Sequence, residues 1–213
     1  PVVEELNETN WDRLVPKGKE VDAIYGDIVM QNQFLRAVIA RPVKTRNANM
    51  TVRNVGGCLI DLTTRTYESD QLSAFYPGRS ANSLEGDPFF AVNGATATVD
   101  NVTTLVGGVI LSVAGTAKSP ALELEYWLSD HEPWLEIEST WTNTTNAELT
   151  LVLEDDLRAD AGKEDMPKSP DGTHDLFWFH DIFWQQAYGL HAPGFRIRCN
   201  SNPRESVLVY EPI

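Results

Sequence analysis

The chain has 213 residues, with 31 acidic and 17 basic side chains, a formal net charge of −14 and 42% hydrophobic residues. A chain of this length and hydrophobic content can bury a large core, which excludes disorder along its whole length. The acidic balance argues against a nucleic acid as partner, because binding to phosphates requires clustered Lys and Arg. No apolar run reaches the eighteen or so residues of a membrane span. Because the chain opens on Pro1, with no initiator Met and no basic leader, we expect a piece of a longer protein.

Residues 1–20 are interpreted as an extension that precedes a single β domain over residues 21–213. Convincing helical patterns are rare, and the two candidates, residues 10–14 and 70–75, are short. The two cysteines of the chain allow at most one disulfide bond, and their spacing does not show whether it forms.

The first half of the β domain shows apolar runs separated by turn residues. Residues 25–40 predict one or two strands around the polar residues 31–33, and Gly56-Gly57 opens an apolar strand that ends at Leu62. Such short runs, bounded by turn residues, are typical of antiparallel strands.

The second half continues this pattern. Residues 91–117 are mostly Val, Thr, Ala and Gly, which favour short strands over helices. Residues 122–128 and 135–141 alternate apolar and polar side chains and predict a hairpin with one core face and one wet face. Further strands are expected at residues 149–153 and 206–210. The sequence therefore predicts an all-β fold of two packed antiparallel sheets, a β-sandwich with few short helices.

Residues 154–175 differ from their surroundings because they contain eight acids and three bases in 22 residues. A long loop of this kind is either a binding loop or a solvated, mobile segment, and the solvated interpretation is favoured. Asp155, Asp156 and Asp160 offer oxygen ligands that suit calcium, but the EF-hand spacing is missing. We therefore expect no metal site and no cofactor.

The order of these pieces resembles a known fold. Residues 26–29 lead into the apolar residues 34–39, Gly56-Gly57 precedes residues 58–62, and the later hairpin ends in Thr142-Asn143-Thr144. Over residues 21–153 this order is similar to the β-supersandwich of galactose-mutarotase-like domains. Residues 47–57 and 70–78 also resemble the leading modules of large secreted bacterial proteins. The resemblance implies a supersandwich, neighbouring domains in the same chain, and an extracellular or periplasmic location.

The activity of that family does not carry over with the fold. Mutarotases open a sugar ring with a Glu base and a His acid, and none of the four histidines, His131, His174, His180 and His191, lies in the expected setting. His174 and His180 are six residues apart, about 20 Å along a strand, so the two cannot share one zinc ion. If the domain is an enzyme, His174 or His180 would carry a proton with Asp156 or Asp175 beside it.

Aromatic side chains are densest near the C-terminal third, where Phe177-Trp178-Phe179 is followed by Phe183-Trp184 and Tyr188. Flat rings bind sugars by stacking on their C–H faces, and we expect Trp178, Trp184 and Tyr188 to form a stacking platform. The alternative is that these rings fill the core between two sheets.

A local basic excess lies within residues 28–60, which contain five basic side chains and no acid. Arg46 and Arg53 are the candidates to contact a carboxylate or sulfate on a sugar, and the alternative is that the basic residues pair with the acidic loop or a neighbouring domain. The favoured hypothesis is a non-catalytic carbohydrate-binding or scaffold module. A sugar-active enzyme domain, aldose-epimerase-like or lyase-like, and a purely structural spacer are the alternatives.

Overall fold

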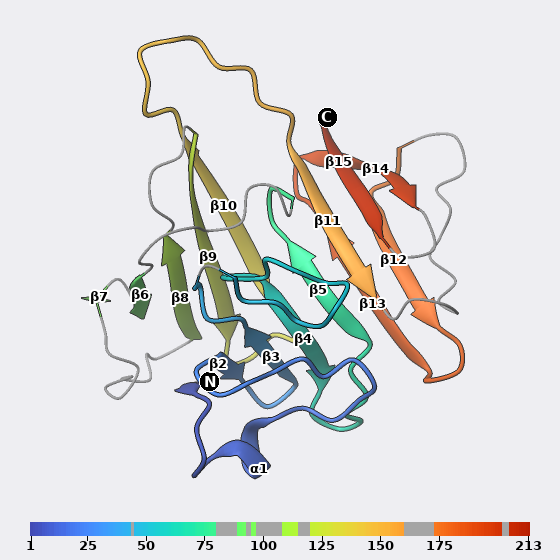
Figure 1. The fold of residues 1–213 in the computed structure, drawn as a ribbon. Coiled ribbons are helices and arrows are strands. Elements are labelled where there is room, and N and C mark those ends of the chain that lie inside the picture. Colours follow the sequence, from blue (N-terminus) through green and yellow to red (C-terminus); the bar gives the residue numbers. More distant parts are fainter. Residues whose placement is uncertain are drawn as a thin grey trace.

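Strands dominate the chain, as the alternation of apolar and polar residues predicts. The computed structural model describes residues 1–43, 45–79, 89–92, 95–96, 108–114, 120–159, 173–201 and 205–213. Its elements are β1 (Val2–Glu5), α1 (Trp11–Leu14), β2 (Ile28–Gln31), β3 (Leu35–Ile39), β4 (Leu59–Thr64), β5 (Leu72–Tyr76), β6 (Phe89–Val92), β7 (Ala95–Thr96), β8 (Gly108–Ala114), β9 (Ala121–Ser129), β10 (Glu136–Thr142), β11 (Glu154–Ala159), β12 (Leu176–Asp181), β13 (Gln186–His191), β14 (Phe195–Ser201) and β15 (Ser206–Pro212). The prediction of an all-β, sandwich-like fold is confirmed (Figure 1).

An eight-stranded antiparallel sheet, in the order β1-β2-β3-β4-β5-β11-β15-β14, forms the main layer. Its first five strands follow one another along the chain. The next strand in the sheet is β11, which is distant from β5 in the chain, and its Asp156 pairs with Tyr76 of β5. Every residue of β3 and β5 is buried, so this part of the sheet is covered on both faces.

Two loop regions, residues 6–27 and 40–58, cover one face of β2 to β5 and lie in front of them in Figure 1. Leu6, Leu14 and Val55 of these loops pack with residues of the sheet in a separate hydrophobic core. Residues 1–20 are therefore part of the fold, because β1 pairs with β2 and α1 packs its Leu14 inward.

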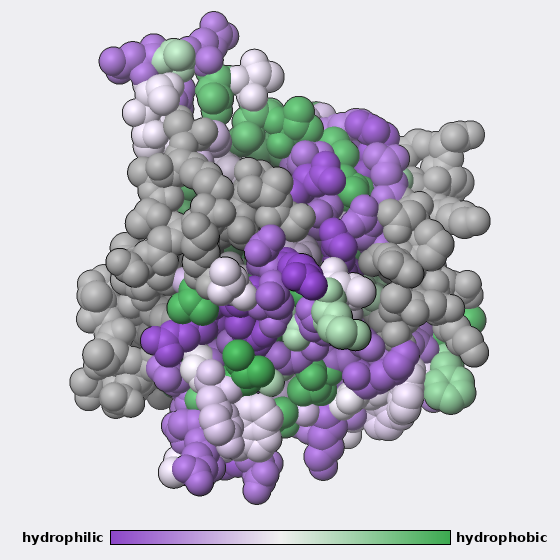
Figure 2. Space-filling view, in the orientation of Figure 1, coloured by the Kyte–Doolittle hydropathy of each residue, from purple (hydrophilic) through white to green (hydrophobic). Residues whose placement is uncertain are grey.

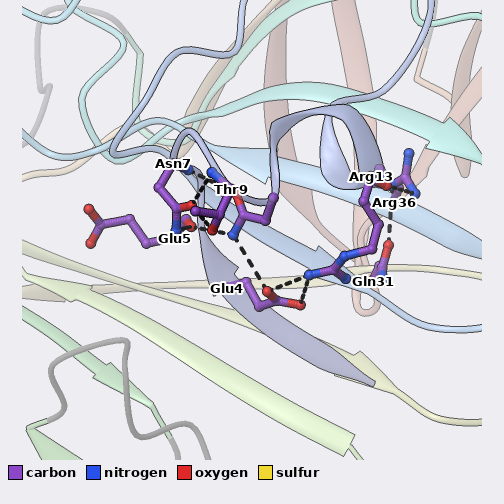
Figure 3. A network of polar contacts seen from close by, with 8 residues as sticks. Glu4, Glu5, Asn7, Thr9, Arg13, Gln31 and Arg36 are labelled. Atoms are coloured by element: carbon purple, nitrogen blue, oxygen red, sulfur yellow. Dashed lines mark hydrogen bonds and ion pairs between the residues drawn. The ribbon is translucent and has the colours of Figure 1, made fainter.

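Polar contacts fix this N-terminal region to the sheet (Figure 3). The Arg13 guanidinium lies 2.7 Å from the Glu4 carboxylate. The nearly buried Arg36 donates hydrogen bonds to the Gln31 side chain and to the Arg13 carbonyl, and forms an ion pair with Glu68 at 2.7 Å. These contacts join α1 to β1, β2 and β3.

The opposite face of the main sheet is covered by two smaller sheets. One has five strands in the order β10-β9-β8-β6-β7, and the other is the β12-β13 hairpin. Leu124 and Tyr126 of β9 share a core with Phe177 and Phe179 of β12 and with apolar residues of the main sheet. In β9 the even-numbered residues are buried and the odd-numbered ones are not, as the predicted hairpin requires.

Three local predictions need correction. Residues 70–75 are not a helix but lead into β5, because this strand is buried on both faces and its apolar run lacks the period of two. Residues 149–153 form no strand, and the strand begins at Glu154 instead, so residues 154–159 of the predicted acidic loop are β11 in the main sheet. The rest of that loop, including Asp160, lies mostly outside the described residues. The structure describes Cys58 and Cys199 as two separate buried thiols.

Within the described part of the chain, no helix is long and apolar enough to cross a membrane.

Candidate functional site

The β12-β13 hairpin carries the aromatic cluster and divides it between two faces. Phe179 and Tyr188 are cross-strand partners, and their rings stack at 4.8 Å between centroids with an interplanar angle of 10° on the core-facing side. Trp178 is paired with Gly189 on the other side and is 50% exposed. Because side chains alternate along a strand, the odd-numbered residues of β12 point inward and the even-numbered ones outward.

Tyr188 therefore belongs to the core and does not share a face with Trp178. Its hydroxyl accepts a hydrogen bond from the backbone N–H of Gln71 at 2.9 Å and lies 3.0 Å from the Leu62 carbonyl and 3.3 Å from the Asp70 carboxylate. The carboxylate of Asp70, which is fully buried, also accepts the N–H of Leu62 at 2.8 Å. These bonds attach the hairpin to β4 and to the two residues that precede β5. Burial, and then the nearby Asp61, raise the pKa of Asp70 well above its ordinary value.

The outward side of the hairpin and its turn form what we call the aromatic hairpin surface. Its members are large apolar side chains that are at least one-third exposed: Leu176, Trp178, Ile182, Phe183 and Trp184. The Phe183 and Trp184 rings meet edge to face, with centroids 5.3 Å apart. A Cβ added at Gly189 would make ordinary van der Waals contacts with Leu176 Cδ1 at 3.7 Å and Phe177 O at 3.9 Å. Because Gly189 has no side chain, the cross-strand partner of Trp178 does not cover its ring.

Polar groups accompany these rings. His180 and His191 lie on the same outward face, opposite Ala187 and Leu176 respectively. At the turn, the buried Asp181 accepts the backbone N–H of Trp184 at 2.9 Å and so holds the turn in shape. The surface therefore combines flat rings with imidazoles that can form hydrogen bonds.

The predicted histidine and carboxylate pairs are spread over the molecule. Asp156 lies beside Tyr76 on the face of the main sheet that is away from the hairpin, and Arg79 Nε lies 3.3 Å from its carboxylate. The main sheet therefore separates Asp156 from His180. His174 pairs through its backbone with Ile197 at the start of the hairpin.

Asp175 is 3.8 Å from Arg196 in an exposed ion pair. Asp175 directly precedes β12, whereas Asp156 lies on the other face of the main sheet.

The two predicted arginines lie in the loop at residues 40–58, on the covered face of the main sheet. Arg46 is 5% exposed, and its guanidinium binds both carboxylate oxygens of the fully buried Asp27, at 2.6 and 3.2 Å. It also donates to the Asp22 carbonyl at 2.8 Å. Arg53 is exposed and donates to the Met50 carbonyl at 3.1 Å. Neither arginine reaches the aromatic hairpin surface, so the structure does not assemble the predicted platform and its predicted arginines into one site.

A large groove separates β10 from β13 above the main sheet. It has a volume of about 1470 Å³ and is lined by both strands. Leu62, Phe75 and Leu157 of the main sheet line its floor, and Ile137 and Trp141 of β10 line one wall.

Asp155 and Tyr210 lie at one end of this groove. The Tyr210 hydroxyl donates a hydrogen bond to the Asp155 carboxylate, which also accepts the N–H of Gly78 at 2.7 Å. Burial raises the pKa of Asp155 to about 6, although both hydrogen bonds lower it. The composition of residues 154–175 predicts a solvated loop for Asp155, and no motif indicates Tyr210 or Trp141, because the groove joins strands that are distant in the chain.

Among the described residues, no group of three or more His, Cys, Asp and Glu side chains is arranged to hold a metal ion.

Comparison with known proteins gives no relative. No family model matches the chain, and searches of curated proteins and of solved structures found no match. The resemblance to galactose-mutarotase-like domains therefore stays a prediction.

Proposed function

We propose that this domain is a non-catalytic carbohydrate-binding module whose ligand stacks on the aromatic hairpin surface. The observation that carries the proposal is the placement of Trp178, which is half exposed and paired with Gly189, on a face that also carries His180 and His191. A flat ring beside a residue without a side chain can accept the C–H face of a sugar, and the imidazoles can bond its hydroxyls. The same proposal includes an extracellular or periplasmic setting and neighbouring domains in a longer chain.

The ligand is expected to be an extended polysaccharide rather than a single sugar. The exposed rings lie both on β12 and on the turn that follows it, so contacts are distributed along the hairpin. Because Arg46 is bound to Asp27 and Arg53 lies across the main sheet, no arginine predicted from the sequence is available to hold an acidic sugar at this surface. A neutral polysaccharide is therefore favoured over a uronic or sulfated one.

Affinity gel electrophoresis on a panel of neutral polysaccharides tests this proposal. Trp178→Ala should abolish the retardation of the protein, with affinity lower by about tenfold or more, because a ring at the centre of a binding surface carries much of the binding energy. Trp184→Ala should weaken retardation as well. Unfolding in urea should change by no more than about 0.5 kcal/mol for Trp178→Ala, since this ring points outward.

Trp134→Ala is the matched control, because Trp134 is also 50% exposed but lies just before β10, outside the aromatic hairpin surface. It should leave retardation unchanged. Equal retardation of the wild type and a folded Trp178→Ala variant on every gel that retards the protein would refute the proposal, and so would a failure of the whole panel to retard the wild type.

A further inference from the structure

The layer that covers the hairpin side of the main sheet is interrupted between two strand edges. In the described part of the chain, β10 pairs with β9 only and β13 pairs with β12 only. Residues of both strands line the groove of about 1470 Å³ between them. An unpaired strand edge presents backbone N–H and C=O groups that another strand can satisfy.

The floor and the inner walls of this groove are mostly apolar, although Thr64 and Ser139 also line it. Leu59, Leu62, Phe75 and Leu157 contribute the floor, and all four also belong to or pack on the main hydrophobic core. The groove exceeds the roughly 300–1,000 Å³ of small-molecule pockets. Apolar side chains below and free backbone groups on both sides fit an extended polypeptide better than a sugar, whose hydroxyls would need polar partners along the floor.

The groove is lined by acidic side chains and by no Lys or Arg among the described residues. The acidic side chains are Glu136 and Glu138 on β10, together with Glu125, Glu154 and Asp155. On β10 the two glutamates share the outer face, whereas Ile137 and Trp141 of the inner face pack on the core. A strand added to this edge would therefore meet carboxylates on one side and apolar side chains on the other.

We propose that the groove between β10 and β13 is an acceptor site for an extended strand of a partner protein, with apolar side chains at alternate positions and Lys or Arg between them. The strand adds to the free edge of β10 over about seven residues, the length of that strand. Its apolar side chains complete the core beside Ile137 and Trp141, and its cations lie opposite Glu136 and Glu138. This site is distinct from the aromatic hairpin surface.

The chain also contains an exposed segment that could compete for such a site. Residues 147–153 connect β10 to β11 without forming a strand and project from the molecule (Figure 1), and Leu149, Leu151 and Val152 are exposed. In Figure 2 hydrophobic atoms gather where this projection returns to the molecule. Its one charged residue is Glu148, which would place a carboxylate near those of β10. Charge therefore favours a basic partner strand over this segment of a second copy.

Fluorescence anisotropy with the labelled peptide Lys-Val-Lys-Leu-Lys-Val-Lys-Leu-Lys tests the proposal. We expect saturable binding to the intact protein. The same peptide N-methylated at alternate residues along one edge should bind at least tenfold more weakly, because it cannot donate those backbone hydrogen bonds. The peptide with Glu in place of Lys should also bind at least tenfold more weakly.

The variant Glu138→Lys locates the site. Because Glu138 is exposed and stands opposite Glu125 on β9, the substitution is compatible with the fold. It should weaken binding of the lysine peptide about fivefold and strengthen binding of the glutamate peptide. Glu8→Lys changes the net charge equally at an exposed position outside the groove and should have no comparable effect.

Equal binding of the N-methylated peptide would overturn the proposal, as would equal effects of Glu138→Lys and Glu8→Lys. Tighter binding of a peptide with the sequence of residues 147–153 would overturn it in favour of a second copy. Displacement of the lysine peptide by a neutral oligosaccharide would overturn it in favour of a sugar site. Trp178→Ala should leave peptide binding unchanged, and Glu138→Lys should leave polysaccharide retardation unchanged, so this proposal and the proposed function can fail separately.

Discussion

The hydroxyl of Tyr188 on β13 accepts a hydrogen bond from the backbone N–H of Gln71 at 2.9 Å. The same oxygen lies 3.0 Å from the carbonyl of Leu62, which is 126 residues earlier in the chain. This contact and the stack on Phe179 give the ring two functions, since its plane packs in the core while its oxygen bonds to β4 and to the residues just before β5. The hairpin that carries Trp178 is therefore held to the main sheet by a buried polar contact as well as by apolar packing.

Tyr188→Phe should lower the free energy of unfolding by about 1–3 kcal/mol, because the N–H of Gln71 loses its buried acceptor while the ring stack remains. Urea denaturation measures the change, and amide hydrogen exchange should show faster exchange in β12 and β13. Tyr67→Phe removes a hydroxyl from a ring that is 57% exposed and serves as the control. A Tyr188→Phe protein as stable as the wild type would contradict the role given to this contact.

The alternation of apolar and polar residues is sufficient to predict a strand wherever one of its faces is exposed to solvent. The even-numbered residues of β9 are buried as expected, and the hairpin with β10 has the expected turn. The pattern failed at Leu72–Tyr76, where burial on both faces removes the alternation that identifies a strand.

The candidate site was predictable only in part. Aromatic density identified the hairpin, but the assignment of Trp178 and Tyr188 to opposite faces depends on the register of β12 with β13, which the residues do not reveal. Likewise, the basic excess around Arg46 and Arg53 could not show that one of them is buried against Asp27 and the other is exposed.

Arg46 and Arg53 should differ sharply on substitution, although both lie in one loop. Arg46→Ala removes the partner of the fully buried Asp27 carboxylate and should destabilise the protein by about 3–5 kcal/mol. Arg53→Ala alters an exposed side chain and should change stability by at most about 0.5 kcal/mol. Thermal and urea unfolding of the two variants distinguish the roles, and equal costs would contradict them.

Asp155 should make stability depend on pH. Its folded-state pKa of about 6 lies above the value of about 3.9 in an unfolded chain, so its contribution is complete below about pH 4 and is lost as the pH rises through 6. The unfolding free energy of the wild type should therefore fall relative to that of Asp155→Asn by about 1–3 kcal/mol between pH 4 and pH 7.

Tyr210→Phe provides a second check on the same carboxylate. The Tyr210 hydrogen bond favours the ionised form, so its removal should raise the pKa of Asp155 further and move the loss of stability to higher pH. Urea unfolding at half-unit pH steps measures both effects. Parallel stability curves for the wild type and Asp155→Asn would show that Asp155 does not titrate in this range.

Gly78 should tolerate no side chain. It has φ of +71°, and a Cβ there would lie 2.3 Å from Cζ2 of Trp141 on β10. Gly78→Ala therefore adds a steric clash to backbone strain and should cost about 2–4 kcal/mol of unfolding free energy. Gly194→Ala, at φ of +82° with nothing within 4 Å, should show the cost of strain alone. The difference between the two variants should shrink when Trp141 is also replaced by Ala, and an unchanged difference would exclude the clash as its cause.

The long connection between the paired strands β5 and β11 affects how the protein folds during synthesis. Strands β1 to β5 can pair as they leave the ribosome, because each neighbour in the sheet is also the next strand in the chain. The other edge of β5 can pair with β11 only after Asp156, about 80 residues after Tyr76, has been synthesised. During that interval the nascent chain exposes the unpaired edge of β5, a strand that is fully buried in the finished fold, and such an edge can pair with another chain.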